Sequence, residues 1–174
     1  MSANFTVTTA TSDAGDVIGE IHAASWRAAY AGFFAPDFFA EALRSRRTKW
    51  HDVLTRQCRN TALLGASDGR PLAFSYFGPS APKEAAGPDA VELFGFYGHP
   101  DGWGSGVAGA LMAATLTAIR ETGARRIDLW TLRDTPQSRR FYAKHGFTES
   151  GRVRDFDYGD GHPLAQVEYA LTLD

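Results

Sequence analysis

Hydrophobic and polar positions alternate near both ends of the chain. The alternation covers residues 5–10, which are rich in β-branched side chains, and residues 166–173, where Val167, Tyr169 and Leu171 alternate with polar residues. Successive side chains of a strand point to opposite faces of a sheet. Each pattern therefore predicts a half-buried strand.

Short apolar runs predict further strands at residues 61–65, 71–77, 90–97 and 126–132. The first two are separated by Ser67-Asp68-Gly69, a sequence typical of a tight hairpin turn.

Apolar residues at helical spacing predict a helix from about Ser105 to Thr122, which Gly123 ends. A first helix is expected after a cap at Ser12-Asp13, running to about Tyr30, and a second from Pro36. We expect Ser45 to cap a further helical piece that runs to about Leu54. The last helix should begin at Thr135-Pro136 and close at Gly146.

This order of strands and helices predicts one mixed α/β domain over residues 1–174. The segment from Gly78 to Asp89 contains three prolines and two glycines, and we interpret it as a loop, because too little chain lies on either side for two separate cores.

Composition narrows the function classes. The hydrophobic share of 44% is sufficient for a core, and a net charge of −2 gives no indication of a nucleic-acid or membrane partner. The lone Cys58 excludes an internal disulfide. The first residues lack the basic start and apolar run of a secretory signal, so we expect a cytoplasmic protein.

The segment DGWGSGVAGALM, residues 101–112, contains G-x-G-x-x-G from Gly104 to Gly109. A dinucleotide-binding turn, another pyrophosphate cradle and a loop without a ligand would all fit that string. A dinucleotide turn needs its first glycine at the tip of a strand, whereas residues 98–103 separate Tyr97 from Gly104 here. Glycines let backbone N–H groups approach a ligand closely, and a helix N-terminus attracts negative charge. These features favour a phosphate or pyrophosphate.

Two longer stretches carry a family resemblance: VELFGFYGHP from Val91, and SRRFYAKHGF from Ser138, with a looser match at SWRAAYAG from Ser25. Together they resemble the GNAT acetyltransferase superfamily, in particular its bacterial small-molecule members. The resemblance implies an α/β fold with a single mixed, mostly antiparallel sheet of about seven strands flanked by about four helices. It also implies an N-acetyltransferase that moves the acetyl group of acetyl-CoA directly to a primary amine of a small molecule or peptide.

The family's acetyl-CoA loop, Gln/Arg-x-x-Gly-x-Gly/Ala, falls on residues 103–108, where Gly106 and Ala108 match and Trp103 departs. Trp103 could instead be a packing residue under the loop. The resemblance implies cofactor contacts from Phe96, Tyr97, Gly98, Trp103, Gly104, Ser105, Gly106, Val107, Ala108, Gly109, Thr135, Ser138 and Tyr142. For Thr135, capping of the last helix is an equal alternative.

Tyr142 occupies the position at which family members place the acid that protonates the departing CoA thiolate, although it could be a core aromatic only. Glu92 matches the position of the base in the histone-acetyltransferase branch. It shares a strand face with Phe94 and Phe96 by alternation, and aromatic surroundings favour a carboxylate that accepts a proton near neutral pH. The alternative is a solvated carboxylate at the strand end.

Aromatic residues crowd the first two helices. We expect Trp26 and Tyr30 to line the acceptor pocket or to belong to the core, and Phe38 and Phe39 to belong to the core. A homodimer is compatible with a domain of this size, and no metal ion is expected. The alternative function is a catalytically weak CoA-binding sensor or scaffold of the same fold.

Overall fold

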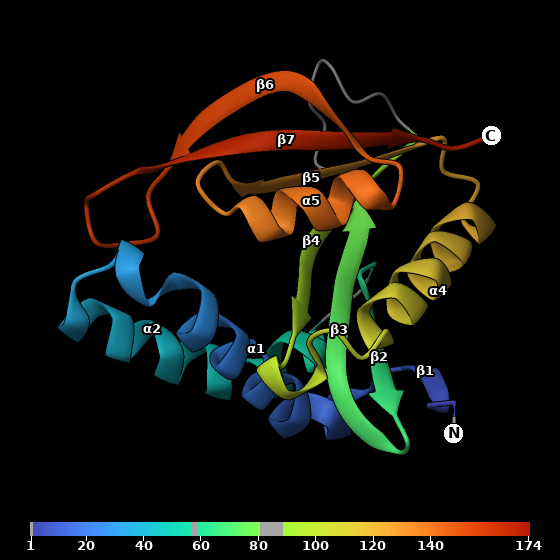
Figure 1. The fold of residues 1–174 in the computed structure, drawn as a ribbon, viewed down its shortest axis with the longest axis horizontal. Helices are drawn as coiled ribbons and strands as arrows, with labels where there is room; N and C mark the ends of the chain where they lie inside the picture. Colours follow the sequence, from blue (N-terminus) through green and yellow to red (C-terminus); the bar gives the residue numbers. More distant parts are fainter. Residues whose placement is uncertain (1, 57–58, 81–88) are drawn as a thin grey trace. The chain divides into compact units, whose positions relative to one another are not determined.

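In the described part of the chain, seven strands hydrogen-bond in the order β1-β2-β3-β4-β5-β7-β6 (Figure 1). The computed structural model describes residues 2–56, 59–80 and 89–174, so Cys58 and most of the loop predicted at Gly78–Asp89 lie outside the described residues. β4 pairs in parallel with β5, whereas β1/β2, β2/β3, β5/β7 and β6/β7 pair antiparallel. The mixed, mostly antiparallel sheet is therefore confirmed.

The chain divides into two compact units, and each is described by itself. The first contains Met1–Phe77 and Gly95–Ala118, and the second contains Gly78–Phe94 and Ile119–Asp174. β4 (Ala90–Gly98) and α4 (Val107–Glu121) each contribute residues to both. The expectation of a single domain over residues 1–174 stays a prediction.

The first unit holds the N-terminal strands and helices. These are β1 (Phe5–Thr9), α1 (Gly15–Tyr30), α2 (Pro36–Thr48), α3 (Trp50–Arg56), β2 (Thr61–Ser67) and β3 (Arg70–Pro79, whose last two residues belong to the second unit). Asp68 and Gly69 have positive φ of 49° and 81°, so the predicted tight hairpin turn joins β2 to β3.

Two expected helix caps in this unit were wrong. Ser12 and Asp13 form a short 3-10 turn, and Ala14 is the residue that precedes α1. Ser45 does not start a new helix, because α2 continues through it and the break comes at Lys49, between α2 and α3. The described residues form five α-helices, where the family resemblance implied about four.

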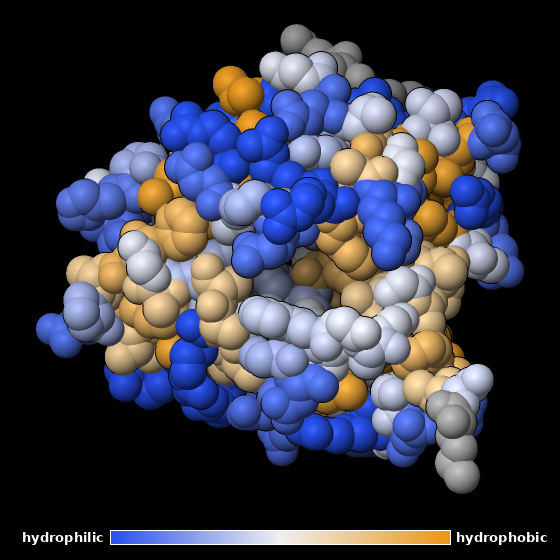
Figure 2. Space-filling model, in the orientation of Figure 1, coloured by the Kyte–Doolittle hydropathy of each residue, from blue (hydrophilic) through white to orange (hydrophobic). Residues whose placement is uncertain are grey.

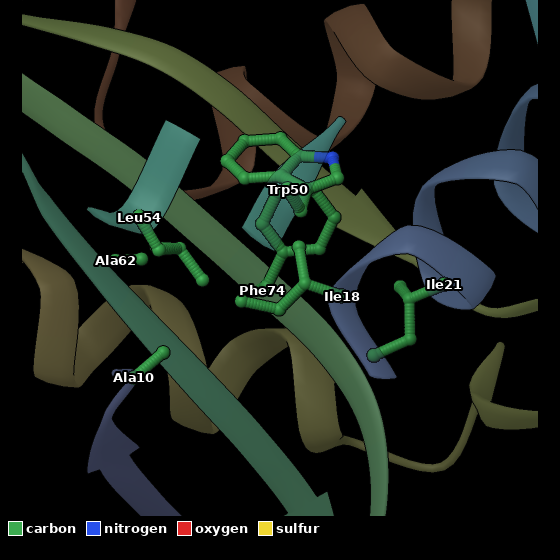
Figure 3. Packing of buried hydrophobic residues seen from close by; sticks show 7 residues of the cluster. All are labelled: Ala10, Ile18, Ile21, Trp50, Leu54, Ala62 and Phe74. Carbon is green, nitrogen blue, oxygen red and sulfur yellow. The ribbon is translucent and has the colours of Figure 1, made fainter. Parts of the chain in front are cut away.

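A buried cluster from α1, α3, β2, β3 and the residue after β1 forms the core of the first unit (Figure 3). Its members are Ala10, Ile18, Ile21, Trp50, Leu54, Ala62 and Phe74. The buried His22 packs beside it, with Nδ1 accepting a hydrogen bond from Trp50 Nε1 at 2.9 Å. Figure 3 shows the Trp50 and Phe74 rings close together between α1 and the strands.

The second unit is built on β5 (Arg126–Leu132), β6 (Thr148–Phe156) and β7 (Leu164–Thr172), with α5 (Pro136–Lys144) between β5 and β6 in the chain. α5 packs on one sheet face, where the Tyr142 ring lies 6.2 Å from that of Tyr169. β6 is the edge strand and is mostly exposed. Figure 2 shows the surface over β6 and β7 as mainly hydrophilic, with small hydrophobic spots.

Candidate active site

The glycine-rich segment forms the entry to α4 in the first unit. A short 3-10 turn at Pro100–Gly102 follows β4, and α4 begins at Val107. Gly104 and Gly106 adopt positive φ values of 75° and 100°, which β-carbon-bearing residues rarely take. The Ser105 hydroxyl donates to the Gly102 carbonyl at 2.7 Å and accepts from the Val107 N–H at 3.2 Å.

Several backbone donors at this entry have no partner among the described residues. The Ser105 N–H donates to Gly102, and the Ala110 N–H donates to Gly106. In the described residues no acceptor faces the N–H groups of Gly104, Gly106, Ala108 and Gly109. Because these donors open a helix of 15 residues, they lie at its positive end. The arrangement suits an anion with several oxygens, such as a pyrophosphate.

Close packing supports the backbone course of this loop. A β-carbon on Gly106 would lie 3.1 Å from the Phe5 ring, and one on Gly102 would lie 3.0 Å from the Leu72 side chain. Around Gly104, by contrast, nothing described lies within 4 Å of such a carbon. Gly106 is therefore restricted both by its backbone conformation and by its surroundings.

Trp103 does not pack under the loop, so that alternative was wrong. Its side chain is 57% exposed, and its Nε1 donates to the Gly98 carbonyl at 3.0 Å. This bond ties the loop to the end of β4, where Phe96 and Tyr97 are half-buried. The Tyr97 ring lies 4.4 Å from that of His22, and burial is the main cause that raises the pKa of its phenol.

Thr135, Ser138 and Tyr142 lie at positions i, i+3 and i+7 around α5 in the second unit, so they line one stripe of that helix. Pro136 is at the first helical position, as expected. Thr135 does not cap the helix through its side chain, because its hydroxyl donates to the Leu132 carbonyl at 2.8 Å. Thr135 is thus the N-cap residue of α5 by backbone position, as expected, without a side-chain cap bond, and its cofactor contact stays a prediction.

The spacing of Tyr142, Gly146 and Phe147 has a structural cause. The Phe147 N–H donates to the Tyr142 carbonyl at 3.1 Å, the Gly146 N–H donates to the Ala143 carbonyl at 3.1 Å, and Gly146 has φ of 92°. These bonds form a Schellman motif, in which an apolar contact joins the residues that Tyr142 and Phe147 occupy. Their rings lie 5.9 Å apart. The helix end thus fixes Tyr142, which is 9% exposed.

Glu92 lies half-buried in β4, at the point where β4 and β5 separate. In the described part of the second unit, the parallel ladder between these strands runs from Ala90 with Arg126 to Glu92 with Asp128 and goes no further. β4 and β5 both continue for several residues beyond that pair. Glu92 is therefore placed at the start of a gap in the ladder.

Trp26 and Tyr30 belong to an aromatic cluster of the first unit. Trp26 is 2% exposed and stacks on Phe34 at 5.5 Å, with the Arg46 guanidinium over its ring. Tyr30 is half-buried, with its ring 5.0 Å from that of Trp26. Phe39 is buried, as expected of a core residue, whereas Phe38 is half-buried. Substrate contact by Trp26 and Tyr30 stays a prediction.

Sequence reasoning missed one group of polar residues, formed by Arg152 and Arg154 on β6 around Trp130 on β5. The two guanidinium carbons lie 5.7 Å and 4.3 Å from the centre of a Trp130 ring. The alternating pair of arginines on either side of Val153 was the only sequence feature that could have drawn attention to it.

A known family model covers most of this chain. The model, described as the acetyltransferase (GNAT) family, matches residues 20–147. The chain belongs to the GNAT acetyltransferase family. The family prediction from the sequence is therefore confirmed, and with it the enzyme class, an acetyl-CoA-dependent N-acetyltransferase.

Solved structures share this GNAT fold at low sequence identity. The PaiA N-acetyltransferase from Thermoplasma acidophilum, determined in complex with coenzyme A, is 17% identical with a TM-score of 0.75, over 98% of this chain and 99% of that chain. YncA from Salmonella typhimurium, determined with its cofactor acetyl-CoA, is 20% identical with a TM-score of 0.68, over 98% and 94%.

The ribosomal-protein-S18-alanine N-acetyltransferase from Escherichia coli is 16% identical with a TM-score of 0.68, over 98% of this chain and 95% of that chain. No curated protein sequence matches this GNAT chain. At these identities the solved structures establish the fold and leave the acceptor to be inferred from the residues.

Neither a metal cluster nor a membrane-spanning helix occurs among the described residues. No group of three or more of their histidine, cysteine, aspartate or glutamate side chains could hold a metal ion. None of the helices they form is both long and apolar enough to cross a membrane.

Proposed function

We propose that this GNAT protein transfers the acetyl group of acetyl-CoA directly to a primary amine of a small molecule or peptide. The observation that carries the proposal is the entry to α4, whose N–H groups at Gly104, Gly106, Ala108 and Gly109 have no acceptor within the described chain. A pyrophosphate supplies acceptor oxygens in the number and charge that such donors require. Thr135 and Ser138 are proposed to contact the remainder of the cofactor.

The acid for the reaction is proposed to be Tyr142. The reference pKa of a tyrosine phenol, about 10, is close to that of an alkyl thiol, so a tyrosine can donate a proton to the sulfur as the carbon–sulfur bond breaks. The Schellman motif supports this role, because it places the Tyr142 ring beside that of Phe147. The proton comes from the Tyr142 hydroxyl, and the electron pair stays on sulfur.

Glu92 is proposed to accept the proton that the attacking amine loses. Its position at the end of the β4/β5 ladder supports the role, because strand N–H groups beyond a broken ladder can donate to the thioester carbonyl. The amine would then attack the carbonyl carbon without a covalent enzyme intermediate.

The test is amine-dependent release of CoA. Purified protein is incubated with acetyl-CoA and a panel of primary amines, and both the free thiol and the acetylated amine are measured. Equal amounts of the two products, with release that rises with amine concentration, support direct transfer. Binding of acetyl-CoA with no acceleration by any amine would contradict it and favour a CoA-binding sensor.

A further inference from the structure

One face of the sheet in the second unit carries charged and aromatic side chains. Residues paired across adjacent strands project to the same face. Along β5, Asp128, Trp130 and Leu132 are alternate residues and lie on one face. Glu92 on β4 pairs with Asp128, and Trp130 pairs with Glu168 on β7. Gln166 on β7 pairs with Leu132 on one side and with Arg154 of β6 on the other. Glu92, Trp130 and Arg154 therefore share one face, and α5 packs on the opposite one through Tyr169, which pairs with Leu129.

The buried carboxylates on this face are already neutralised. Asp128, 4% exposed, accepts from Arg126 Nε at 2.5 Å. Glu168, 1% exposed, accepts from Arg152 at 3.1 Å and from the Ser150 hydroxyl at 2.7 Å, with Arg126 at 3.5 Å. Two arginines thus balance two buried acids.

Arg154 is different, because no carboxylate of the described residues forms an ion pair with it. Within the described residues no Asp or Glu oxygen lies within 4.0 Å of its nitrogens, although the residue is half-buried. Its only hydrogen bond there runs from Nε to Gln166 Oε1, at 2.7 Å. The two terminal guanidinium nitrogens make no hydrogen bond within the described residues. Their parallel N–H groups can donate together to the oxygens of a carboxylate or phosphate.

The Arg154 guanidinium is also held in a fixed orientation. It lies 4.3 Å from the Trp130 ring centre and 5.0 Å from that of Phe156. Gln166, buried at 6% exposure, is itself anchored by donating from Nε2 to the Tyr158 hydroxyl at 2.7 Å. A guanidinium held by these contacts loses little side-chain entropy when it binds an oxyanion.

We propose that Arg154 binds a carboxylate or phosphate group of the acceptor, so that the acceptor is an amine that also carries an oxyanion. The inference rests on the proposed function, since it concerns the acceptor of the same reaction. Glu92 would take the amine end and Arg154 the anionic end of one molecule. A plain polyamine fits less well, because its second ammonium would face an unpaired guanidinium.

Electrostatics indicate that Glu92 and Arg154 influence each other without forming an ion pair. Burial is the main cause that lowers the pKa of Arg154, and the negative charge of Glu92 is the leading one that raises it. An arginine stays protonated at neutral pH in spite of such a shift. The two side chains are thus close enough to influence each other across this face.

The experiment compares matched acceptors. Steady-state kcat/KM is measured for free amino acids against their carboxamides, and for phosphoethanolamine against ethanolamine, with acetyl-CoA saturating. Within each pair, kcat/KM for the anionic acceptor is divided by kcat/KM for the neutral one. This ratio is compared between the parent protein and Arg154→Gln, so that differences in amine basicity cancel. We expect the ratio to fall about 10- to 100-fold in the variant for the carboxylate pairs, the phosphate pair or both. The series that responds identifies the oxyanion.

Two further variants separate binding from folding. Gln166→Glu still accepts from Arg154 Nε, and it can accept from the Tyr158 hydroxyl where glutamine donates to it. It supplies a carboxylate to the guanidinium, so it should lower the same ratio without removing Arg154. Arg133→Gln, a control at an exposed arginine of the same unit that pairs with Asp134, should leave the ratio unchanged. Melting temperatures confirm that each variant is folded.

The outcomes are distinguishable. A ratio that is unchanged in both Arg154→Gln and Gln166→Glu, while neutral amines are acetylated, overturns the anion-binding role and leaves the proposed function intact. If no amine of either kind is acetylated, the proposed function fails, and this inference fails with it.

Discussion

Glycine residues shape the start of α4 and the end of α5, with opposite results. At the start of α4, Gly104 and Gly106 hold a loop in which several N–H groups have no acceptor among the described residues. At the end of α5, Gly146 allows a Schellman motif in which the carbonyls of Tyr142 and Ala143 accept backbone bonds. An unsatisfied helix end can bind a ligand directly, whereas a satisfied one can only position a side chain.

Substitutions at the two helix ends should impair different steps, and the largest expected effect is a loss of turnover at α5. Tyr142→Phe removes the proton donor but keeps the ring that packs on Phe147. Because a positioned general acid contributes roughly 100-fold or more, kcat should fall by about that factor. Binding of acetyl-CoA, measured by calorimetry, should stay near the parent value.

The matched control is Tyr169→Phe. Its hydroxyl belongs to the same unit but donates to Glu149, and its ring neighbours that of Tyr142. It should leave kcat within a few-fold of the parent. Equal turnover of Tyr142→Phe and the parent would remove Tyr142 from the chemistry and leave it as a structural partner of Phe147.

The second expected defect is at the start of α4. Gly106→Ala places a methyl 3.1 Å from the Phe5 ring at φ of 100°, so the loop must shift and its donors with it. We expect the Kd for acetyl-CoA to rise at least about tenfold, equivalent to roughly 1.4 kcal/mol. Gly123→Ala is the control, because Gly123 has a similar φ of 82° and open space around it within the described structure. An unchanged Kd in Gly106→Ala would contradict the loop's role.

A third, smaller effect should appear in stability. Gly146→Ala forces a side chain into φ of 92°, where the added carbon makes only an ordinary 3.5 Å contact with Leu171. The cost is therefore backbone strain, roughly 1 to 3 kcal/mol in the free energy of unfolding measured with urea. Because the strained residue follows the turn that holds Tyr142, kcat should fall as well. Loss of stability with full activity would show that the motif does not position Tyr142.

The smallest expected effect is the change of stability with pH, to which one histidine in each unit contributes. Burial, then the charges of Lys49 and Arg46, hold the pKa of His22 in the first unit well below its usual value. Burial, then the charge of Lys144, lower the pKa of His145 at the end of α5. Below about pH 6.5 the unfolded chain therefore binds protons that the folded protein does not, so stability falls as pH falls.

Urea unfolding between about pH 8 and 5.5 measures this slope, which for each histidine is at most about 1.4 kcal/mol per pH unit. His22→Gln should remove more of the slope than His145→Gln, because His22 is the more deeply buried. A slope that neither substitution changes would contradict the assignment.

The elements that could be predicted from the sequence are those with local causes. The hairpin at Asp68-Gly69, the start of α5 at Pro136 and its end at Gly146 follow from backbone preferences of those residues alone. The glycine loop could be recognised as a candidate anion site for the same reason. Ser45 was misjudged as a helix start because α2 continues through it to Thr48, which local spacing does not reveal. The Thr135 side chain makes no cap bond, because its hydroxyl donates to the Leu132 carbonyl instead.

Arg154 could not have been identified in the same way. Its significance depends on strand register, which brings Gln166 and Trp130 beside it, and on the pairing of the neighbouring Arg152 with Glu168. Neither register nor the partner of a given arginine is encoded in local spacing, and β6 is mostly exposed, with a register shift between Glu149 and Val153.

The most direct test of the central claim is the stabilisation of the protein by CoA compared with pantetheine, which has the thiol arm but no pyrophosphate. Thermal unfolding is followed with each ligand at equal concentration. We predict that CoA at roughly 100 times its Kd stabilises the folded protein by about 2.7 kcal/mol and therefore raises its melting temperature. Pantetheine should raise it much less. Equal stabilisation by the two, or none by CoA, would contradict a pyrophosphate cradle at the start of α4.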